Sequence, residues 1–154
     1  MGVEIERKFL VRDRGFLTGL QGQRLVQGYL SHTPRATVRL RLQGERAWLT
    51  LKGENRGAWR REFEYPLPID DARIMLDEMC PGGVIDKTRY RVPDQHRVWE
   101  VDVFHGDNQG LIVAELELTR EDESFPRPAW LGEEVTADPR YYNSALSQTP
   151  YVLW

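Results

Sequence analysis

The chain has 154 residues and a formal net charge of −3, so it is not a general binder of nucleic acids or of anionic membranes. It has no signal-peptide pattern and no apolar run long enough to span a bilayer, and its one cysteine, Cys80, can form no internal disulfide. We therefore predict a single soluble, cytoplasmic domain over residues 1–154, long enough to bury a core.

Alternating polar and apolar residues predict strands along most of the chain. The predicted strands cover residues 3–12, 24–31, 36–43, 46–53, 59–67, 85–92, 97–104 and 111–119. Short polar turns, several of them with glycine, separate many of these strands and favour antiparallel hairpins.

Two helices are expected between and after the strands. The first covers residues 71–79, with Asp70 or Asp71 as its N-cap and Pro81-Gly82-Gly83 as its stop. The second follows Asp138-Pro139, because proline suits the first turn of a helix.

The first strand has one charged face. Successive side chains of a strand point to opposite sides, so Glu4, Glu6 and Lys8 share a face and Ile5 and Phe9 lie on the other. For one strand, a solvated face with cross-strand ion pairs explains such a pattern well.

The same alternation recurs in the other strands, and the charges are sorted by strand rather than mixed. In these strands the charged residues alternate largely with apolar ones, so their side chains fall on one face of the sheet, which we call the charged parity. The residues of this charged parity are Glu4, Glu6, Lys8, Arg39, Arg41, Lys52, Glu62, Glu64, Lys87, Arg89, Glu100, Asp102, Glu115 and Glu117. A mainly β (α+β) fold accounts for this pattern, namely a closed eight-stranded antiparallel barrel, or tunnel, with a charged lumen. We expect the aromatic and aliphatic residues to face outward, where helices and terminal segments cover them.

The chemistry of such a lumen suits an anion together with a metal ion. Buried charges resist leaving water, so the lumen should hold water, ions and a highly charged ligand. Arginine and lysine side chains from several strands suit a polyphosphate. Clustered carboxylates without nearby sulfur or imidazole ligands suit Mg²⁺ or Mn²⁺. His32, His96 and His105 fall in or near turns and are expected at the surface.

These residues also match the pattern of a known family. The chain resembles the CYTH superfamily, the triphosphate tunnel metalloenzymes, in its small stand-alone bacterial form. The resemblance spans nearly the whole chain and rests on Glu4-x-Glu6-x-Lys8, Gln27-Gly28-Tyr29-Leu30, Arg39-x-Arg41, Leu51-Lys52-Gly53, Glu62-x-Glu64, Lys87-x-Arg89-Tyr90, Ala114-Glu115-x-Glu117, Trp130-Leu131-Gly132-x-Glu134-Val135-Thr136 and Arg140-Tyr141-x-Asn143. It implies an eight-stranded tunnel that binds a linear triphosphate with Mg²⁺ or Mn²⁺.

The resemblance also implies roles for the charged residues. The triphosphate-binding cations are Lys8, Arg39, Arg41, Lys52, Lys87 and Arg89, and Lys8 and Lys52 also count as catalytic candidates because they neutralise charge in the transition state. The first choices as metal ligands are Glu4, Glu6, Glu115 and Glu117. The candidates for completing the metal shell, orienting the attacking water or accepting its proton are Glu62, Glu64, Glu100 and Asp102.

A few residues outside the charged set carry alternative interpretations. The Tyr29 hydroxyl either donates to a phosphate or positions water, or the ring only fills the barrel. Arg60 and Arg91 share the parity of the lumen residues but lie near strand ends, so we expect them at a mouth or on the surface. The aromatic residues expected on the outer apolar face are Trp130, Tyr141, Tyr142 and Trp154. Cys80 is interpreted as structural or inert.

Members of the family cleave inorganic triphosphate, nucleoside triphosphates or thiamine triphosphate, and some are adenylate cyclases. We predict a metal-dependent triphosphatase acting on inorganic triphosphate, because a small chain leaves little room for reading a nucleoside. An adenylate cyclase of the same fold and a non-catalytic binder of polyphosphate or a nucleotide are the alternatives. No nucleic-acid or membrane partner is expected, and both a monomer and a homodimer are compatible with the sequence.

Overall fold

The computed structural model describes residues 2–154 and consists mainly of β-strands. The strands are β1 (Val3–Val11), β2 (Gln23–His32), β3 (Ala36–Gln43), β4 (Arg46–Gly53), β5 (Trp59–Leu67), β6 (Ile85–Asp94), β7 (Arg97–Phe104), β8 (Ile112–Glu117) and β9 (Leu131–Glu134). The first eight coincide with the predicted strands to within a few residues, whereas β9 was not predicted. No helix within residues 2–154 is long and apolar enough to cross a membrane.

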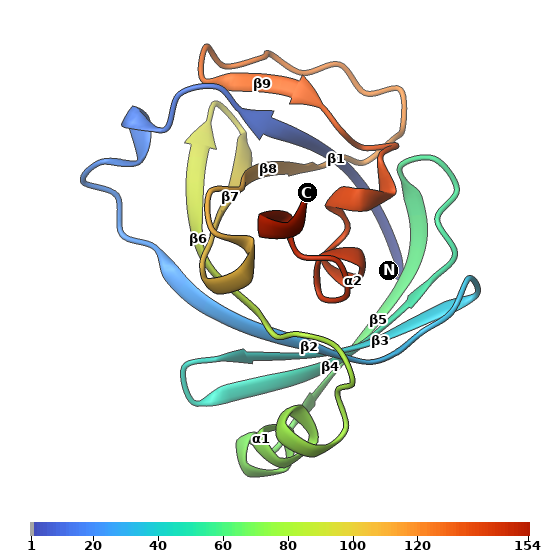
Figure 1. Ribbon diagram of the computed structural model, residues 1–154. Coiled ribbons are helices and arrows are strands. Elements are labelled where there is room, and N and C mark those ends of the chain that lie inside the picture. Colours follow the sequence, from blue (N-terminus) through green and yellow to red (C-terminus); the bar gives the residue numbers. More distant parts are fainter. Residues whose placement is uncertain (1) are drawn as a thin grey trace.

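The sheet closes on itself, as predicted. The hydrogen-bonded order is β5-β4-β3-β2-β6-β7-β8-β1-β9, and β1 also pairs with β5 (Figure 1). All pairings are antiparallel, and closure runs through Val3 opposite Arg61, Glu4 opposite Arg60 and Ile5 opposite Trp59. Eight strands therefore form the barrel, and β9 pairs with the end of β1 near Phe9 and Val11.

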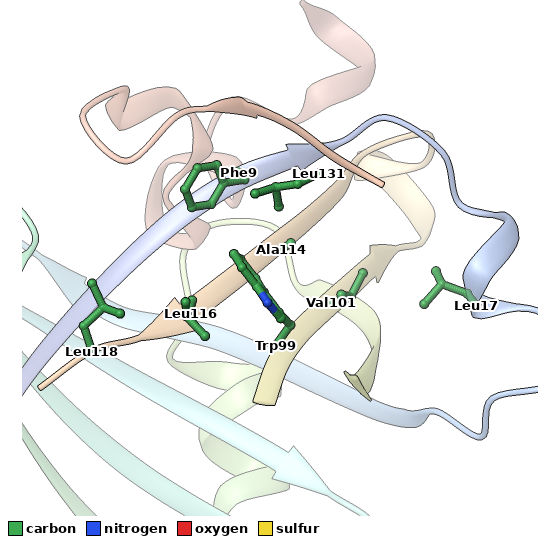
Figure 2. Close-up of a cluster of buried hydrophobic side chains, with 8 residues drawn as sticks. All are labelled: Phe9, Leu17, Trp99, Val101, Ala114, Leu116, Leu118 and Leu131. Atoms are coloured by element: carbon green, nitrogen blue, oxygen red, sulfur yellow. The ribbon is translucent and has the colours of Figure 1, made fainter. Parts of the chain in front are cut away.

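The main hydrophobic core lies outside the barrel, on the outer face of β1, β7 and β8. Figure 2 shows Phe9, Trp99 and Leu116 within this cluster. The Phe9 and Trp99 rings meet edge to face at a centroid distance of 5.7 Å, and Phe16 stacks on Trp130 at 4.3 Å. The prediction that the apolar face points outward is confirmed here, as is the outer position of Trp130.

Helix α1 (Ile69–Glu78) covers the outer face of the barrel at β2, β3 and β4. A Cβ atom on Gly28 would lie 2.8 Å from the Cys80 Sγ, so a residue without a side chain lets the end of this helical segment approach β2. The predicted N-cap was wrong, because Pro68 holds that position without a side-chain hydrogen bond. Asp70 and Asp71 lie in the first turn, where carboxylates favourably meet the helix dipole.

The C-terminal segment lies within the ring of strands rather than outside it (Figure 1). It contains a short 3-10 helix (Pro139–Tyr141), α2 (Asn143–Leu146) and a last 3-10 turn (Tyr151–Leu153). Asp138 caps the first of these by accepting a hydrogen bond from the Arg140 backbone N–H. The predicted helix after Pro139 is thus divided into short pieces.

Apolar side chains on the inner face of the barrel hold this segment. Leu146 is fully buried in a cluster with Ile85, Phe104 and Val113, and Tyr141 packs against the same cluster. The prediction that all apolar residues and terminal segments lie outside is therefore wrong at this end of the barrel. The reason is that the inward-facing positions of β6, β7 and β8 change from charged to apolar near one end of each strand.

Candidate active site

One charged cavity of about 200 Å³ occupies the middle of the barrel. Its lining residues are Glu4, Glu6, Lys8, Tyr29, Thr37, Arg39, Arg41, Lys52, Arg60, Glu62, Glu64, Lys87, Arg89, Glu100, Glu115, Glu117, Tyr142, Asn143 and Ser144. Every predicted site residue except Asp102 lines this space, henceforth the central cavity. Every lysine of the chain is among them, namely Lys8, Lys52 and Lys87.

Strands β2 and β3 supply one basic wall. The Arg39 guanidinium donates to the Thr50 hydroxyl at 3.2 Å and lies 3.8 Å from the Glu64 carboxylate. The Arg41 Nε donates to the Gln27 carbonyl oxygen at 2.9 Å. Burial, together with the nearby Arg39 and Arg89 charges, lowers the pKa of Arg41 to about 10. Such crowded cations favour an anion in the space between them.

Two buried donors of this wall have no hydrogen-bond partner within residues 2–154: the Gln27 Nε2 and the Arg39 Nε. A buried donor without an acceptor costs about 1–3 kcal/mol, so an anionic oxygen near these groups would relieve that cost. Gln27 was not among the predicted site residues. Its position inside β2 at the parity of Tyr29 was the available sign of its inward orientation.

The second basic wall is built around Asp102. The Asp102 carboxylate lies 2.7 Å from the Lys87 Nζ, and it accepts hydrogen bonds from the Arg89 Nε and Nη2 at 2.7 and 2.9 Å. Burial would raise the pKa of Asp102, but Arg89 and Lys87 lower it below its usual value. Burial lowers the pKa of Lys87 to about 8, although Asp102 acts in the opposite direction. Asp102 thus orients two cations from behind the cavity wall.

A first cluster of carboxylates, Glu4 and Glu62, forms ion pairs that connect β1, β4 and β5. The Lys52 Nζ lies 3.3 Å from Glu4 and 3.0 Å from Glu62, and the Arg60 Nε lies 3.5 Å from Glu4. Burial opposes ionisation of Glu4, yet Lys52 and Arg60 bring its pKa down to about 2. Burial raises the pKa of Glu62, and Glu4 adds to this effect despite Lys52. Arg60, which was expected at a mouth or on the surface, lines the central cavity.

A second acidic group lies where β1 meets β8. Glu6 stands opposite Glu117, and Lys8 stands opposite Glu115 in the register. Burial and the charges of Glu115 and Glu4 raise the pKa of Glu6 well above its usual value. Burial also raises the pKa of Glu117. Carboxylates that disfavour one another's ionisation in this way create a local demand for a cation.

This group of oxygen donors fits a hard divalent cation. No three side chains of His, Cys, Asp or Glu among the described residues form a ready-made metal cage. Mg²⁺ does not require one, because it keeps several waters and binds through one or two carboxylates plus substrate phosphates. His32, His96 and His105 are exposed and outside the central cavity, as predicted.

The C-terminal segment contributes to the site, which the sequence interpretation missed. The Lys8 Nζ donates to the Tyr141 carbonyl oxygen and the Lys87 Nζ to the Asn143 Oδ1, both at 3.4 Å. The Lys8 Nζ also lies 5.4 Å from the centre of the Tyr142 ring. The expectation that Tyr141, Tyr142 and Trp154 pack on the outer face was wrong. Tyr142 lines the cavity, and Trp154 packs on Tyr141 at a ring-centroid distance of 5.0 Å.

The two remaining predicted positions are a tyrosine and a rim arginine. Tyr29 is buried and lines the cavity, where burial raises the pKa of its phenol. Its ring also packs in the apolar cluster with Leu146 and so fills part of the barrel interior. Tyr29 therefore both lines the cavity and fills part of the barrel. Arg91 is 69% exposed and lies 3.6 Å from Glu100, which agrees with the predicted place at a mouth.

Comparison with known proteins identifies close relatives. The chain is 42% identical over 151 residues to an inorganic triphosphatase of Acetivibrio thermocellus, with 98% of this chain and 97% of the relative covered. It is also 42% identical over 151 residues to an inorganic triphosphatase of Nitrosomonas europaea, with 94% and 96% covered. A solved structure of an inorganic triphosphatase superposes with a TM-score of 0.68 and 37% identity, covering 93% of this chain and 96% of that one.

A family model supports the same relationship. The model of the CYTH domain matches residues 2–150, which include every strand of the barrel and the cavity-lining part of the C-terminal segment. The chain belongs to the CYTH family.

Proposed function

We propose that the protein hydrolyses a phosphoanhydride bond of inorganic triphosphate with the help of Mg²⁺ or Mn²⁺. The observation that carries this proposal is the central cavity, where seven cations and a set of carboxylates from different strands face one another. A pure anion binder would gain nothing from acids that repel its ligand. The names of the relatives from Acetivibrio thermocellus and Nitrosomonas europaea support the same activity.

In this proposal the basic walls hold the phosphate chain. The contributing side chains are Lys8, Arg39, Arg41, Lys52, Lys87 and Arg89. One guanidinium group can bind two phosphate oxygens at once through two parallel hydrogen bonds, whereas an ammonium group acts as a point charge. Because Asp102 already fixes Lys87 and Arg89, these cations are oriented before the substrate arrives, which lowers the reorganisation needed in the transition state.

The carboxylates where β1 meets β8 would hold the metal ion. Glu4, Glu6, Glu115 and Glu117 are its proposed ligands, and a bound divalent cation would neutralise charge on the phosphate oxygens. Asp102 was also a candidate ligand, but its carboxylate is engaged by Lys87 and Arg89. We therefore assign Asp102 to positioning those cations rather than to the metal shell, and Glu100 remains a proposed contributor.

The proton of the attacking water needs an acceptor near the cavity. Glu62 and Glu64 are the proposed acceptors, with Glu62 the first choice because its raised pKa favours taking a proton. The water oxygen bonds to a terminal phosphorus, the bridging P–O bond breaks with its electrons on the departing pyrophosphate, and the proton passes to the carboxylate. Tyr29 is proposed to orient a terminal phosphate or the water.

The proposal is tested by assaying the purified protein with triphosphate, pyrophosphate and ATP in the presence of Mg²⁺ or Mn²⁺. Triphosphate should be the best substrate, because pyrophosphate loses one or two charge-assisted contacts, each worth roughly 1.5–3 kcal/mol. Cyclic AMP with pyrophosphate as the main products from ATP would instead establish a cyclase. Binding of triphosphate without turnover under any metal condition would establish a non-catalytic binder.

The cellular setting belongs to the same proposal. We place the protein in the cytoplasm as one functional unit over residues 1–154, acting on a small-molecule substrate. Its single free cysteine supports a reducing compartment.

A further inference from the structure

One wall of the central cavity is connected to the surface through Thr37, which takes no part in the hydrolysis proposed above. Thr37 lies on β3, is 5% exposed and lines the cavity. Its Oγ1 lies 3.0 Å from the Nδ1 of His32, whose side chain is exposed. A hydroxyl group can accept one hydrogen bond while it donates another, so this contact links the cavity to solvent.

A β-bulge in β2 aims the His32 side chain at Thr37. Earlier on the same strand, Tyr29 lines the cavity and stands opposite Arg39, so simple alternation would turn His32 outward. The register shifts between Tyr29 and Ser31, and His32 stands opposite Thr37 as a result. Bulges redirect side chains in this way and are frequent next to active sites. His32 therefore reaches the rim of the cavity, although alternation alone would place it on the outer face.

The turn between β2 and β3 holds this pair of side chains in place. The Thr33 N–H donates to the Ala36 carbonyl oxygen at 2.9 Å, and the Ala36 N–H donates to the Thr33 hydroxyl oxygen at 3.1 Å. The two strands leave this closed turn with His32 and Thr37 directly opposite each other. Little reorganisation is therefore needed for the two side chains to exchange a proton.

Thr37 also stands in a row of side chains that leads to the proposed proton acceptor. It lies opposite Lys52 in the β3–β4 register, and Lys52 lies opposite Glu62 in the β4–β5 register. Opposed side chains on one face of a sheet have Cβ atoms about 4.5–5.5 Å apart. The Lys52 Nζ is 3.0 Å from the Glu62 carboxylate. The row of His32, Thr37, Lys52 and Glu62 thus runs from the rim to the carboxylates of the cavity.

Hydrolysis leaves a proton in the cavity that must be discarded in every turnover. The attacking water loses its proton to a cavity carboxylate, and that carboxylate must be ionised again before the next reaction. Substrate and metal ion would displace much of the water from a cavity of about 200 Å³, so a route through side chains becomes useful. Histidine suits such a route because its ring gains and loses protons near neutral pH. Of the three histidines, His32 is the one that hydrogen bonds within residues 2–154 connect to a cavity-lining residue.

We propose that Thr37 and His32 form an outlet through which this proton leaves the cavity. The inference rests on the proposed hydrolysis, because a non-catalytic binder would produce no proton. The neutral His32 ring accepts at Nδ1 and carries its own proton on Nε2. The Thr37 oxygen takes up the proton from a cavity water as its hydroxyl proton moves to Nδ1. The resulting imidazolium gives a ring proton to a buffer base, so the hydroxyl group and the neutral ring are restored and only O–H and N–H bonds change.

The test replaces the His32 ring by a free base in solution. In weakly buffered solution, His32→Ala should lower kcat for triphosphate by at least about 10-fold, which is less than the roughly 100-fold or more that losing a general acid or base costs. KM should change little, because His32 does not line the cavity. Imidazole added to the assay should restore most of the lost kcat. A residue that only braced the hairpin would show no such restoration.

Two further variants make the comparison specific. Thr37→Val keeps the shape of the side chain but removes the hydroxyl group, so kcat should fall and imidazole should not restore it. His96→Ala removes an exposed histidine from the turn between β6 and β7 and should keep full kcat, with no response to imidazole. Thermal unfolding of all three variants checks that the barrel is intact.

The outcomes separate the outlet from the hydrolysis itself. An unchanged kcat in His32→Ala, or a loss that imidazole does not correct, would overturn the inference. Restoration of Thr37→Val by imidazole would overturn it as well, because the hydroxyl group would then not be part of the route. Absence of triphosphate hydrolysis by the unaltered protein would instead refute the proposed function.

Discussion

The Lys87 ammonium lies 2.7 Å from the Asp102 carboxylate, and both side chains are shielded from solvent, at 1% and 0% exposure. Asp102 also binds Arg89 through two hydrogen bonds, so one carboxylate balances two cations of the cavity wall. Without the charge of Asp102, Lys87 and Arg89 would repel each other at a site that water barely reaches.

Asp102→Asn should therefore lower the free energy of unfolding by about 3–5 kcal/mol, the typical effect of removing one partner from a buried ion pair. Urea denaturation monitored by tryptophan fluorescence measures this change. The matched control is Asp86→Asn, which removes the partner of the exposed Arg24 and should cost less than about 1 kcal/mol. Similar losses in the two variants would contradict the role assigned to Asp102.

The lowered pKa of Lys87 predicts a pH effect on stability. Below about pH 8 the amine is protonated in both states, and above pH 10.5 it is neutral in both. Between these values the unfolded chain binds the additional proton, so this residue makes the folded state more stable as pH rises. From pH 8 to 9.5, the free energy of unfolding should rise by about 1–2 kcal/mol more in the unaltered protein than in Lys87→Met. Parallel pH profiles in urea denaturation would contradict this prediction.

The carboxylates facing the cavity predict dependence on a divalent cation. Excess chelator should abolish triphosphate hydrolysis, and Mg²⁺ or Mn²⁺ should restore it. Glu117→Gln should lower kcat/KM by at least about 100-fold, because it removes charge from the proposed metal site without opening a cavity. Glu133→Gln, in the exposed part of β9, serves as the control and should keep its activity. Full turnover in chelator would refute the metal-dependent mechanism.

Binding of an anion should stabilise the barrel, since like charges are crowded in its lumen. Saturating triphosphate should raise Tm, and the increase should become smaller as salt screens the cations. Arg39→Gln should weaken this stabilisation, whereas Arg24→Gln on the outer face should preserve it. Differential scanning fluorimetry at two salt concentrations makes the comparison. A Tm that does not respond to triphosphate would place the binding site elsewhere.

The sequence predicted the barrel and its charged lumen because both depend on a period of two residues. The alternation of side chains was sufficient to predict that Glu4, Arg39 and Glu115, from β1, β3 and β8, face one cavity. The same rule located the outer core around Phe9 and Trp99.

Parity does not show where along a strand a charged lining gives way to an apolar one. Ile85 and Phe104 point inward like Lys87 and Asp102 on the same strands. They nevertheless belong to the apolar cluster against which the C-terminal segment packs. That segment lacks a strand period, so its entry into the barrel depends on tertiary packing. Strand β9 escaped prediction because only four residues, Leu131–Glu134, pair with the end of β1.

The confinement of every lysine to the cavity has a practical consequence for chemical labelling. Reagents selective for primary amines, such as activated esters and aldehyde cross-linkers, find no lysine on the outer surface of the barrel, where the cations are guanidinium groups. Apart from the α-amino group, Lys8, Lys52 and Lys87 are the amines such reagents can modify, and acylation there removes the charge that would meet a phosphate. Immobilisation or dye attachment through lysine would thus block the cavity itself. Arginine-directed reagents would reach the same site, because Arg39, Arg41 and Arg89 also line the cavity, so the thiol of Cys80, which lies outside the cavity, is the appropriate attachment point for this protein.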